Sequence, residues 1–139
     1  MKIAVAQHNY HIGNFEQNSN KIIQSIQKAE SEDIDLIIFS ELCICGYPPL
    51  DLLEQRDFIE KCLDAANSIA KHCTNTAAII GCPTLNNGEN GKKLYNSALF
   101  LHEGKIAQTF HKTLLPTYDI FDEYRYFEPN TEFEILEFK

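Results

Sequence analysis

Residues 36–49 read LIIFSELCICGYPP, and this stretch decides the fold. Its first four residues, Leu36 to Phe39, are apolar and lie between charged positions. A run this short favours a central strand covered on both faces over a buried helix. A loop is predicted from Gly46 to Pro49, because consecutive prolines remove backbone donors and disfavour helix. Glu41 is therefore expected just beyond the carboxyl end of a central strand.

Strands and helices alternate around this predicted strand. Before it, residues 2–7 predict a strand, and an amphipathic helix is expected from Asn14, which forms a capping-box pattern with Gln17, to residues 30–33. After it, apolar positions from Phe58 to Ala70 predict a second helix that ends near Lys71 or His72.

The rest of the chain predicts strands. They are a buried strand over 77–82 closed by Pro83, a hairpin of strands over 94–101 and 106–110, and a final strand near 133–138. Alternating strands and helices predict an α/β layered sheet, in which functional groups collect at the carboxyl ends of strands. Lys112, like Glu41, is expected at such a strand end.

Composition limits the classes of function. The chain has 139 residues, of which 44% are hydrophobic, and a net charge of -8, as expected for one globular domain. The negative charge, without a basic cluster, argues against nucleic acid and anionic membranes as partners. No apolar stretch approaches the ~20 residues that span a bilayer, and the first residues read as a strand rather than a signal peptide. We therefore expect no membrane partner and a cytoplasmic location.

Cysteine and histidine patterns predict neither a disulfide scaffold nor a metal site. The five cysteines form no CxxC pair, and several occupy apolar patterns. His8 and His11 have no cluster of further ligands at a recognised spacing. Because no glycine-rich phosphate loop occurs either, no cofactor is predicted in this chain.

Glu41 and Lys112 are the candidate catalytic residues. Each residue alone is more often a surface charge or an ion-pair partner. Together at strand ends, however, a carboxylate and an ammonium are what a thiol or hydroxyl nucleophile needs for attack on a carbonyl.

The flanking segments resemble a known family. Ser40-Glu41 followed by Gly46-Tyr47-Pro48, and Lys112 followed by Leu115-Pro116 and an aromatic, acidic loop, resemble two signatures of the nitrilase-type carbon-nitrogen hydrolase superfamily. The stretches GYPPLDLL (46–53) and FDEYRYFEP (121–129) most resemble the glutaminase domain of glutamine-dependent NAD+ synthetases. The resemblance covers nearly the whole chain and implies a partial α-β-β-α sandwich, with residues 1–139 as the amino-terminal part of the domain.

The resemblance also implies roles for individual residues. Glu41 would be the general base, Lys112 would stabilise a thiolate and then an oxyanion, and Glu123 would be a second glutamate that positions catalytic groups. Tyr118 would line the glutamine pocket, although a partly buried loop tyrosine explains it equally well. Glutamine would be the substrate, and a synthetase domain outside this chain would use ATP and Mg2+ to amidate nicotinic acid adenine dinucleotide with the released ammonia.

The sequence departs from the family at the nucleophile. The family's cysteine follows a later strand in a Cys-Glu context, and none of Cys43, Cys45, Cys62, Cys73 and Cys82 has that context. We therefore expect a truncated glutaminase domain that releases no ammonia alone. Uncovered sheet surface predicts a homo-oligomer or limited solubility. Two alternatives remain: a fragment of an amidase or carbamoylase, or a short non-catalytic binding module.

Overall fold

A computed structural model describes all of residues 1–139 and contains one five-stranded sheet. The strands, which lie side by side in chain order, are β1 (Ile3–Val5), β2 (Leu36–Ile38), β3 (Ala77–Leu85), β4 (Leu94–His102) and β5 (Lys105–His111). The first three are parallel, whereas β3, β4 and β5 are antiparallel. The parallel half requires helical crossovers, and the antiparallel half is closed by tight connections.

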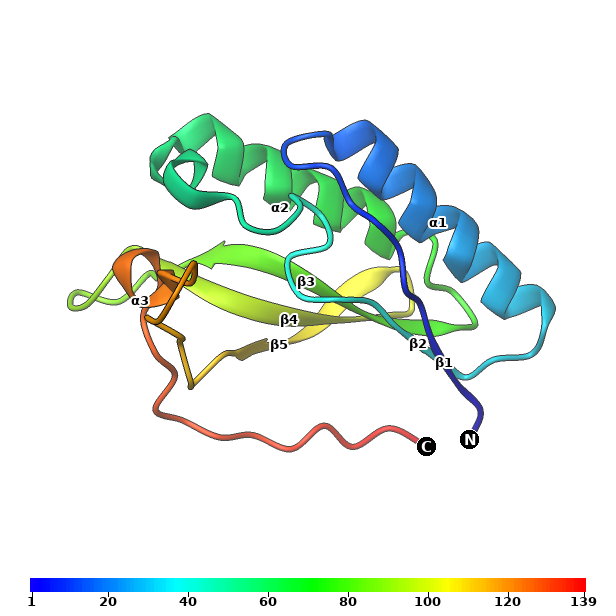
Figure 1. Cartoon of the computed structure of the whole chain (residues 1–139). Coiled ribbons are helices and arrows are strands. Elements are labelled where there is room, and N and C mark those ends of the chain that lie inside the picture. Colours follow the sequence, from blue (N-terminus) through cyan, green and yellow to red (C-terminus); the bar gives the residue numbers. More distant parts are fainter.

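Both long helices pack on the same face of the sheet, as Figure 1 shows. They are α1 (Phe15–Ser31) and α2 (Arg56–Ala70), and they bury a continuous apolar core against β3 and β4. The predicted amino-terminal cap of α1 is confirmed, because Asn14 Oδ1 accepts a hydrogen bond from the backbone N of Gln17 at 3.1 Å. Neither helix is long and apolar enough to cross a bilayer.

Two short helical segments lie near the carboxyl ends of β2 and β3. A 3-10 helix, η1 (Leu50–Glu54), follows the proline loop, and α3 (Glu123–Tyr126) follows the long loop after β5. The helices on one side of a mixed sheet confirm the predicted α/β class and give the helix and sheet layers of a partial sandwich.

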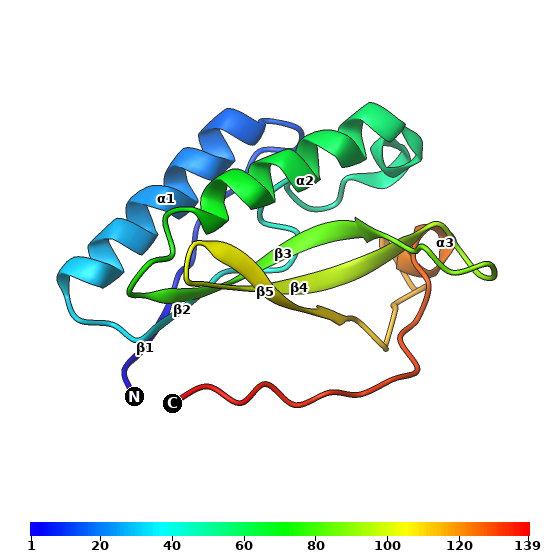
Figure 2. The same ribbon diagram turned by 180° about the vertical axis from the view of Figure 1, so that it is seen from behind.

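The opposite face of the sheet is partly covered by the last residues of the chain, 128–139, which run along it (Figure 2). Leu136 and Phe138 pack there against a small cluster around Phe100. The predicted strand over 133–138 is wrong: the segment is extended but forms no ladder. Only two of its four apolar residues contact the sheet: Leu136 and Phe138 pack on it, whereas Phe133 and Ile135 are exposed.

The prediction that Pro83 closes its strand is also wrong, since β3 continues to Leu85. β2 pairs with β3 only over Ala77–Ile79, so the later part of β3 has β4 as its single paired strand. Pro83 lies opposite Asn96. The Asn96 carbonyl accepts a hydrogen bond from the backbone N of Lys112, just after β5, and so points away from β3; this cross-strand pair therefore exchanges no hydrogen bonds. A proline can occupy such an edge position because its missing N–H has no ladder partner there.

Candidate active site

The loop after β2 positions Glu41 by crossing closely over Gly81 of β3. A Cβ atom at Gly81 would lie 2.2 Å from the backbone N of Leu42 and 2.8 Å from the carbonyl carbon of Glu41. Leu42 itself adopts a left-handed conformation with φ of 48°, which is strained for a branched side chain. Its side chain is fully buried, so core packing holds the turn in place. Glu41 therefore occupies a rigid corner beyond the strand end.

Lys112 follows the last residue of β5 directly. Its backbone N donates to the carbonyl of Asn96 at 2.8 Å, and its carbonyl accepts from the backbone N of Asn130 at 3.1 Å. Both sides of the Lys112 backbone are thus hydrogen-bonded, which directs the side chain towards Glu41.

Glu123 begins α3, which the core holds in place. Phe127, at the end of α3, is 1% exposed and forms a bridge with Leu94 of β4. The backbone N of Glu123 donates to the carbonyl of Pro116 at 3.0 Å. These contacts place the Glu123 carboxylate of α3 near the start of β4 and the end of β5.

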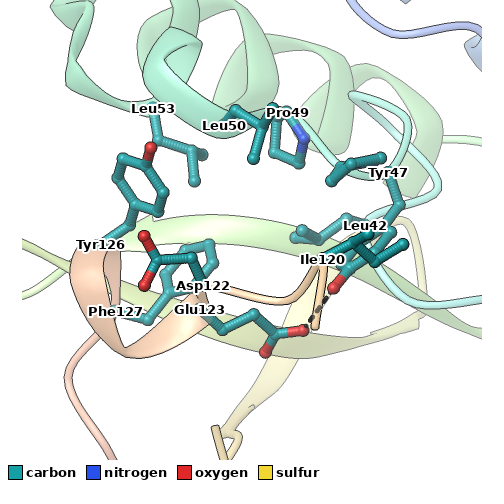
Figure 3. Close-up of a pocket in the computed structure, with 11 residues that line it drawn as sticks. Leu42, Tyr47, Pro49, Leu50, Leu53, Ile120, Asp122, Glu123, Tyr126 and Phe127 are labelled. Carbon is teal, nitrogen blue, oxygen red and sulfur yellow. Dashed lines mark hydrogen bonds between the residues drawn. The ribbon is translucent and has the colours of Figure 1, made fainter. Parts of the chain in front are cut away.

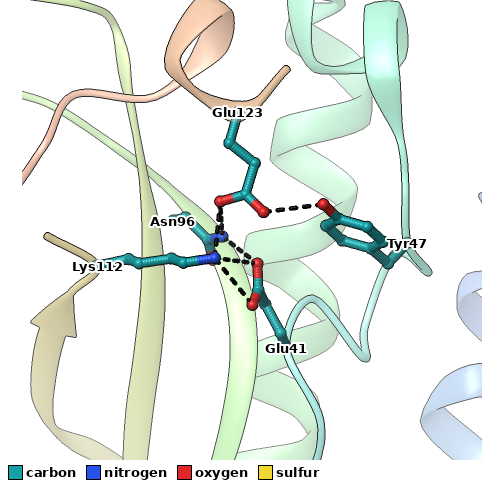
Figure 4. Close-up of polar contacts among 5 residues, drawn as sticks. All are labelled: Glu41, Tyr47, Asn96, Lys112 and Glu123. Atoms are coloured by element: carbon teal, nitrogen blue, oxygen red, sulfur yellow. Dashed lines mark hydrogen bonds and ion pairs between the residues drawn. The ribbon is translucent and has the colours of Figure 1, made fainter. Parts of the chain in front are cut away.

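The three predicted catalytic residues form one hydrogen-bonded cluster, shown in Figure 4. Lys112 Nζ lies 3.0 Å from Glu41 Oε1, 3.1 Å from Glu41 Oε2 and 2.8 Å from Glu123 Oε2. Asn96 Nδ2 donates to Glu41 Oε1 at 2.7 Å and to Glu123 Oε2 at 3.4 Å. Tyr47 Oη donates to Glu123 Oε1 at 2.9 Å. One ammonium, one amide and one phenol therefore serve two carboxylates.

The two glutamates of the cluster differ in how far their side chains are buried. The Glu41 side chain is 42% exposed and that of Glu123 is 6% exposed. Burial alone lowers the pKa of Lys112, but hydrogen bonds to Glu123 and Glu41 and the charges of both carboxylates outweigh it, so the pKa is raised above 10.5. Lys112 therefore stays protonated at neutral pH. The exposed carboxylate is suited to proton transfer, and the buried one to holding Lys112.

Sequence reasoning missed Asn96 and Tyr47 as members of the cluster. Tyr47 lay in a segment that carried the family resemblance, but neither residue type indicates proton chemistry by itself. Burial and the hydrogen bond to Glu123 raise the pKa of Tyr47 above its ordinary value. A signal for Asn96 was available: a polar residue next to Ser97 in an otherwise apolar strand is expected to have a buried hydrogen-bond partner.

Tyr118, the predicted glutamine-pocket residue, lies in the loop between β5 and α3 and is 68% exposed. Its ring contacts Phe121 edge to face at 5.5 Å, and Phe121 in turn lies 6.3 Å from the ring of Tyr47. Tyr118 is thus connected to the cluster through an aromatic row, without a hydrogen bond to Glu41 or Lys112. Its role in substrate binding stays a prediction.

A pocket lies between α3, η1 and the proline loop, and Figure 3 shows its lining. It shares Tyr47 and Glu123 with the cluster, whereas Glu41, Asn96 and Lys112 do not line it. Leu53 and Tyr126 face each other across its other end. The pocket therefore adjoins the cluster only at Tyr47 and Glu123, and Glu41 does not face it.

All five cysteines are buried and none forms a disulfide. Burial raises the pKa of Cys43 and of Cys73 to about 12, and it raises that of Cys82 as well. Cys62 lies on α2, whereas Cys73 lies just beyond its end. A buried thiol with a raised pKa is a poor nucleophile. The cysteines of this chain therefore act as core residues.

The two histidines near the amino terminus contact polar residues of α1. His8 Nε2 lies 2.8 Å from Ser25 Oγ, and His11 Nδ1 lies 2.7 Å from Gln17 Oε1. No group of three or more His, Cys, Asp and Glu side chains in the chain is arranged to hold a metal ion.

The chain thus combines a strand-end glutamate and lysine, a second glutamate that is buried, and a mixed sheet under two helices, which is an α/β domain with a charged site at its strand ends. The chain belongs to the carbon-nitrogen hydrolase family, whose sequence model matches residues 2–138. It is similar to the glutamine-dependent NAD(+) synthetases of Synechocystis sp. (40% identical over 141 residues, 99% of this chain) and Xanthomonas campestris (40% over 129 residues, 92% of this chain). The chain spans 25% and 23% of the length of these relatives.

Solved structures agree with this membership. The glutamine-dependent NAD+ synthetase of Acinetobacter baumannii superposes with a TM-score of 0.88 at 34% identity, over 98% of this chain and 25% of that one. An amidase from Nesterenkonia sp. shares the fold, with a TM-score of 0.76 at 22% identity over 95% of this chain and 49% of its own. The predicted family and fold are therefore confirmed.

Proposed function

We propose that this chain supplies the base and the cation of a glutamine-hydrolysing site that feeds ammonia to NAD+ synthesis. The observation that carries the proposal is the cluster of Glu41, Lys112 and Glu123, in which a half-exposed carboxylate shares one lysine with a buried carboxylate. Relatives named glutamine-dependent NAD(+) synthetases support glutamine as the amide that is hydrolysed.

Each residue has a distinct step. Glu41 takes the proton of a cysteine thiol, and Lys112 stabilises the resulting thiolate and then the oxyanion formed on the glutamine side-chain carbonyl. Glu41 passes the thiol proton to the amide nitrogen, so the C–N bond breaks, ammonia leaves and a thioester remains. Ionised again, Glu41 removes a proton from the water that hydrolyses the thioester. Glu123 holds Lys112 between the two carboxylates throughout.

The nucleophile and the use of ammonia lie outside these residues. Because the five cysteines are buried in the core, the reacting thiol is supplied by polypeptide other than residues 1–139. The ammonia is consumed by a synthetase domain that uses ATP and Mg2+ to amidate nicotinic acid adenine dinucleotide. The five unpaired cysteines support a cytoplasmic location, and the exposed apolar side chains support a homo-oligomer.

A segment exchange tests the proposal. Residues 1–139 replace the matching segment of the Synechocystis synthetase, and NAD+ formation is measured with glutamine or with ammonium salt as the nitrogen donor. We expect the exchanged enzyme to use both donors. The variants Glu41→Gln and Lys112→Met should lose use of glutamine by at least about 1000-fold but keep use of ammonium, since only the hydrolytic site is changed.

Two results would overturn the proposal. One is full use of glutamine by the Glu41→Gln enzyme. The other is faster hydrolysis of simple amides or N-carbamoyl amino acids than of glutamine, which would place the segment with the amidases or carbamoylases.

A further inference from the structure

Asn96 contacts all three charged residues of the cluster. Its side chain is buried, with the residue 3% exposed, and its Nδ2 reaches Glu41 Oε1 at 2.7 Å and Glu123 Oε2 at 3.4 Å. Only Nδ2 can donate to a carboxylate, so chemistry fixes the orientation of the amide. The carbonyl of the same residue accepts from the backbone N of Lys112. Asn96 therefore contacts the side chains of Glu41 and Glu123, shown in Figure 4, and the backbone of Lys112.

These contacts make the two oxygens of Glu41 unequal. Oε1 accepts from Asn96 Nδ2 and from Lys112 Nζ, which together occupy its two lone pairs. Oε2 accepts only from Lys112 Nζ, at 3.1 Å, and keeps one lone pair free. The side chain is 42% exposed, so that lone pair is accessible to a reactant.

Glu123 offers no comparable free oxygen. Its Oε1 accepts from Tyr47, its Oε2 accepts from Lys112 and Asn96, and its side chain is 6% exposed. Two carboxylates share a single ammonium here, so one negative charge is uncompensated within the cluster. The amide of Asn96 adds a neutral donor that contacts both carboxylates.

We infer that Asn96 is a positioning residue that occupies Oε1 of Glu41 and thereby makes Oε2 the oxygen that receives the proton. The inference rests on the proposed function, because the proton is that of the attacking thiol. The S–H bond breaks, its electron pair stays on sulfur as the thiolate beside Lys112, and a new O–H bond forms at Oε2. Oε2 then gives this proton to the nitrogen that leaves as ammonia. In the hydrolytic half, Oε2 removes a proton from water while the water oxygen bonds to the thioester carbon.

The hydrogen bond is tested in the 139-residue chain itself by NMR of the Asn96 side-chain amide. We expect one Nδ2 proton to resonate downfield and to exchange slowly, because it donates to a charged acceptor at 2.7 Å. Glu41→Gln should move this resonance upfield, since a neutral acceptor bonds more weakly. If the Asn96 side-chain amide protons instead resonate in the usual range for asparagine and do not shift in Glu41→Gln, the inference is overturned.

Ser97→Ala is the matched control. Ser97 is the next residue of β4 and is also buried, but its Oγ bonds to His111 Nδ1 and Thr84 Oγ1 instead of the cluster. The Asn96 resonance should keep its position in this variant. A shift as large as that of Glu41→Gln would show that the resonance reports general packing, and would count against the inference.

The positioning role is tested by kinetics in the exchanged synthetase described above. Asn96→Leu keeps the branching at Cγ but removes the donor. With glutamine, kcat should fall about 10- to 100-fold with KM changed by less than about threefold. Asn96→Asp should also move the acidic limb of the pH profile to higher pH, because a third carboxylate raises the pH at which the cluster first takes up a proton. Use of ammonium should be unchanged in both variants.

The two experiments separate the possible failures. A kcat within twofold of wild type in Asn96→Leu would overturn the positioning role. An exchanged enzyme that does not hydrolyse glutamine would overturn the proposed function and, with it, the proton transfer. The NMR comparison decides independently whether Asn96 occupies Oε1.

Discussion

Lys112 Nζ lies 3.0 Å from Glu41 Oε1, although 71 positions separate the two residues in the sequence. The sheet accounts for this proximity. β2 is parallel to β3, which pairs with β4, and β4 pairs with β5, so the ends of β2 and β5 meet at the same edge of the sheet. The loop over Gly81 then brings Glu41 across β3 towards Lys112. The cluster is thus a product of strand pairing rather than of local sequence.

Lys112 should make the stability of the chain depend on alkaline pH. Its pKa is raised in the folded state, so its contribution is complete below the unfolded value of about 10.5 and is lost as pH rises through the folded value. Urea unfolding at pH 8 to 11.5 should show a steeper loss of unfolding free energy in the native chain than in Lys112→Met. Parallel curves for the two proteins would contradict this prediction.

Tyr47→Phe should destabilise the fold by about 1–3 kcal/mol, because it leaves a buried oxygen of Glu123 without its phenol donor. Tyr124→Phe is the control, since Tyr124 is 51% exposed and its hydroxyl has no partner in the cluster. Chemical denaturation of both variants measures the difference. Equal stability of the two variants would show that water replaces the Tyr47 hydroxyl without cost.

Gly81→Ala should displace the loop that carries Glu41. The added Cβ would lie 2.2 Å from the backbone N of Leu42, so the backbone has to move, at a cost of about 1–3 kcal/mol or more. Gly88→Ala in the exposed turn is the control, because its nearest neighbour is the end of the Asn86 side chain at 3.0 Å. Amide chemical shifts of residues 40–44 should change in Gly81→Ala and remain in place in Gly88→Ala.

The cysteines should react slowly with thiol reagents in the native chain. All five are buried, and burial raises the pKa of Cys43 and Cys73 to about 12, so the reactive thiolate is scarce at neutral pH. With an aromatic disulfide at pH 7.5, modification should follow the rate of unfolding, whereas all five thiols should react at once in concentrated urea. A cysteine that reacts within seconds in the native chain would be a candidate nucleophile and would contradict this assignment.

Self-association should involve the exposed apolar side chains near the termini. Val5 lies on the edge strand β1, and Phe133 and Ile135 are 79% and 87% exposed. Light scattering should therefore show an oligomer that Phe133→Ser with Ile135→Ser weakens, because such side chains favour association. A stable monomer at high concentration would contradict the prediction.

Local patterns were sufficient for most elements. The helix that begins after Asn14, the buried strand that precedes Glu41 and the hairpin of β4 and β5 all follow from periodicity, capping and turn residues. Two predictions failed where local pattern and tertiary setting differ. Pro83 lies in the part of β3 that β2 does not pair with, so its missing N–H has no ladder partner there. In residues 133–138, Leu136 and Phe138 pack on the sheet face instead of pairing with a strand.

The sequence by itself determined the α/β class, the strand-end positions of Glu41 and Lys112, and the resemblance to carbon-nitrogen hydrolases. These depend on interactions between residues close in the chain and on motifs that can be read directly. Only the tertiary structure decided that Asn96 and Tyr47 complete the cluster, that Glu123 is buried while Glu41 is half exposed, and that the cysteines lie in the core. Hydrogen bonds and burial between distant segments depend on how strands pair and loops cross, and no local pattern specifies them.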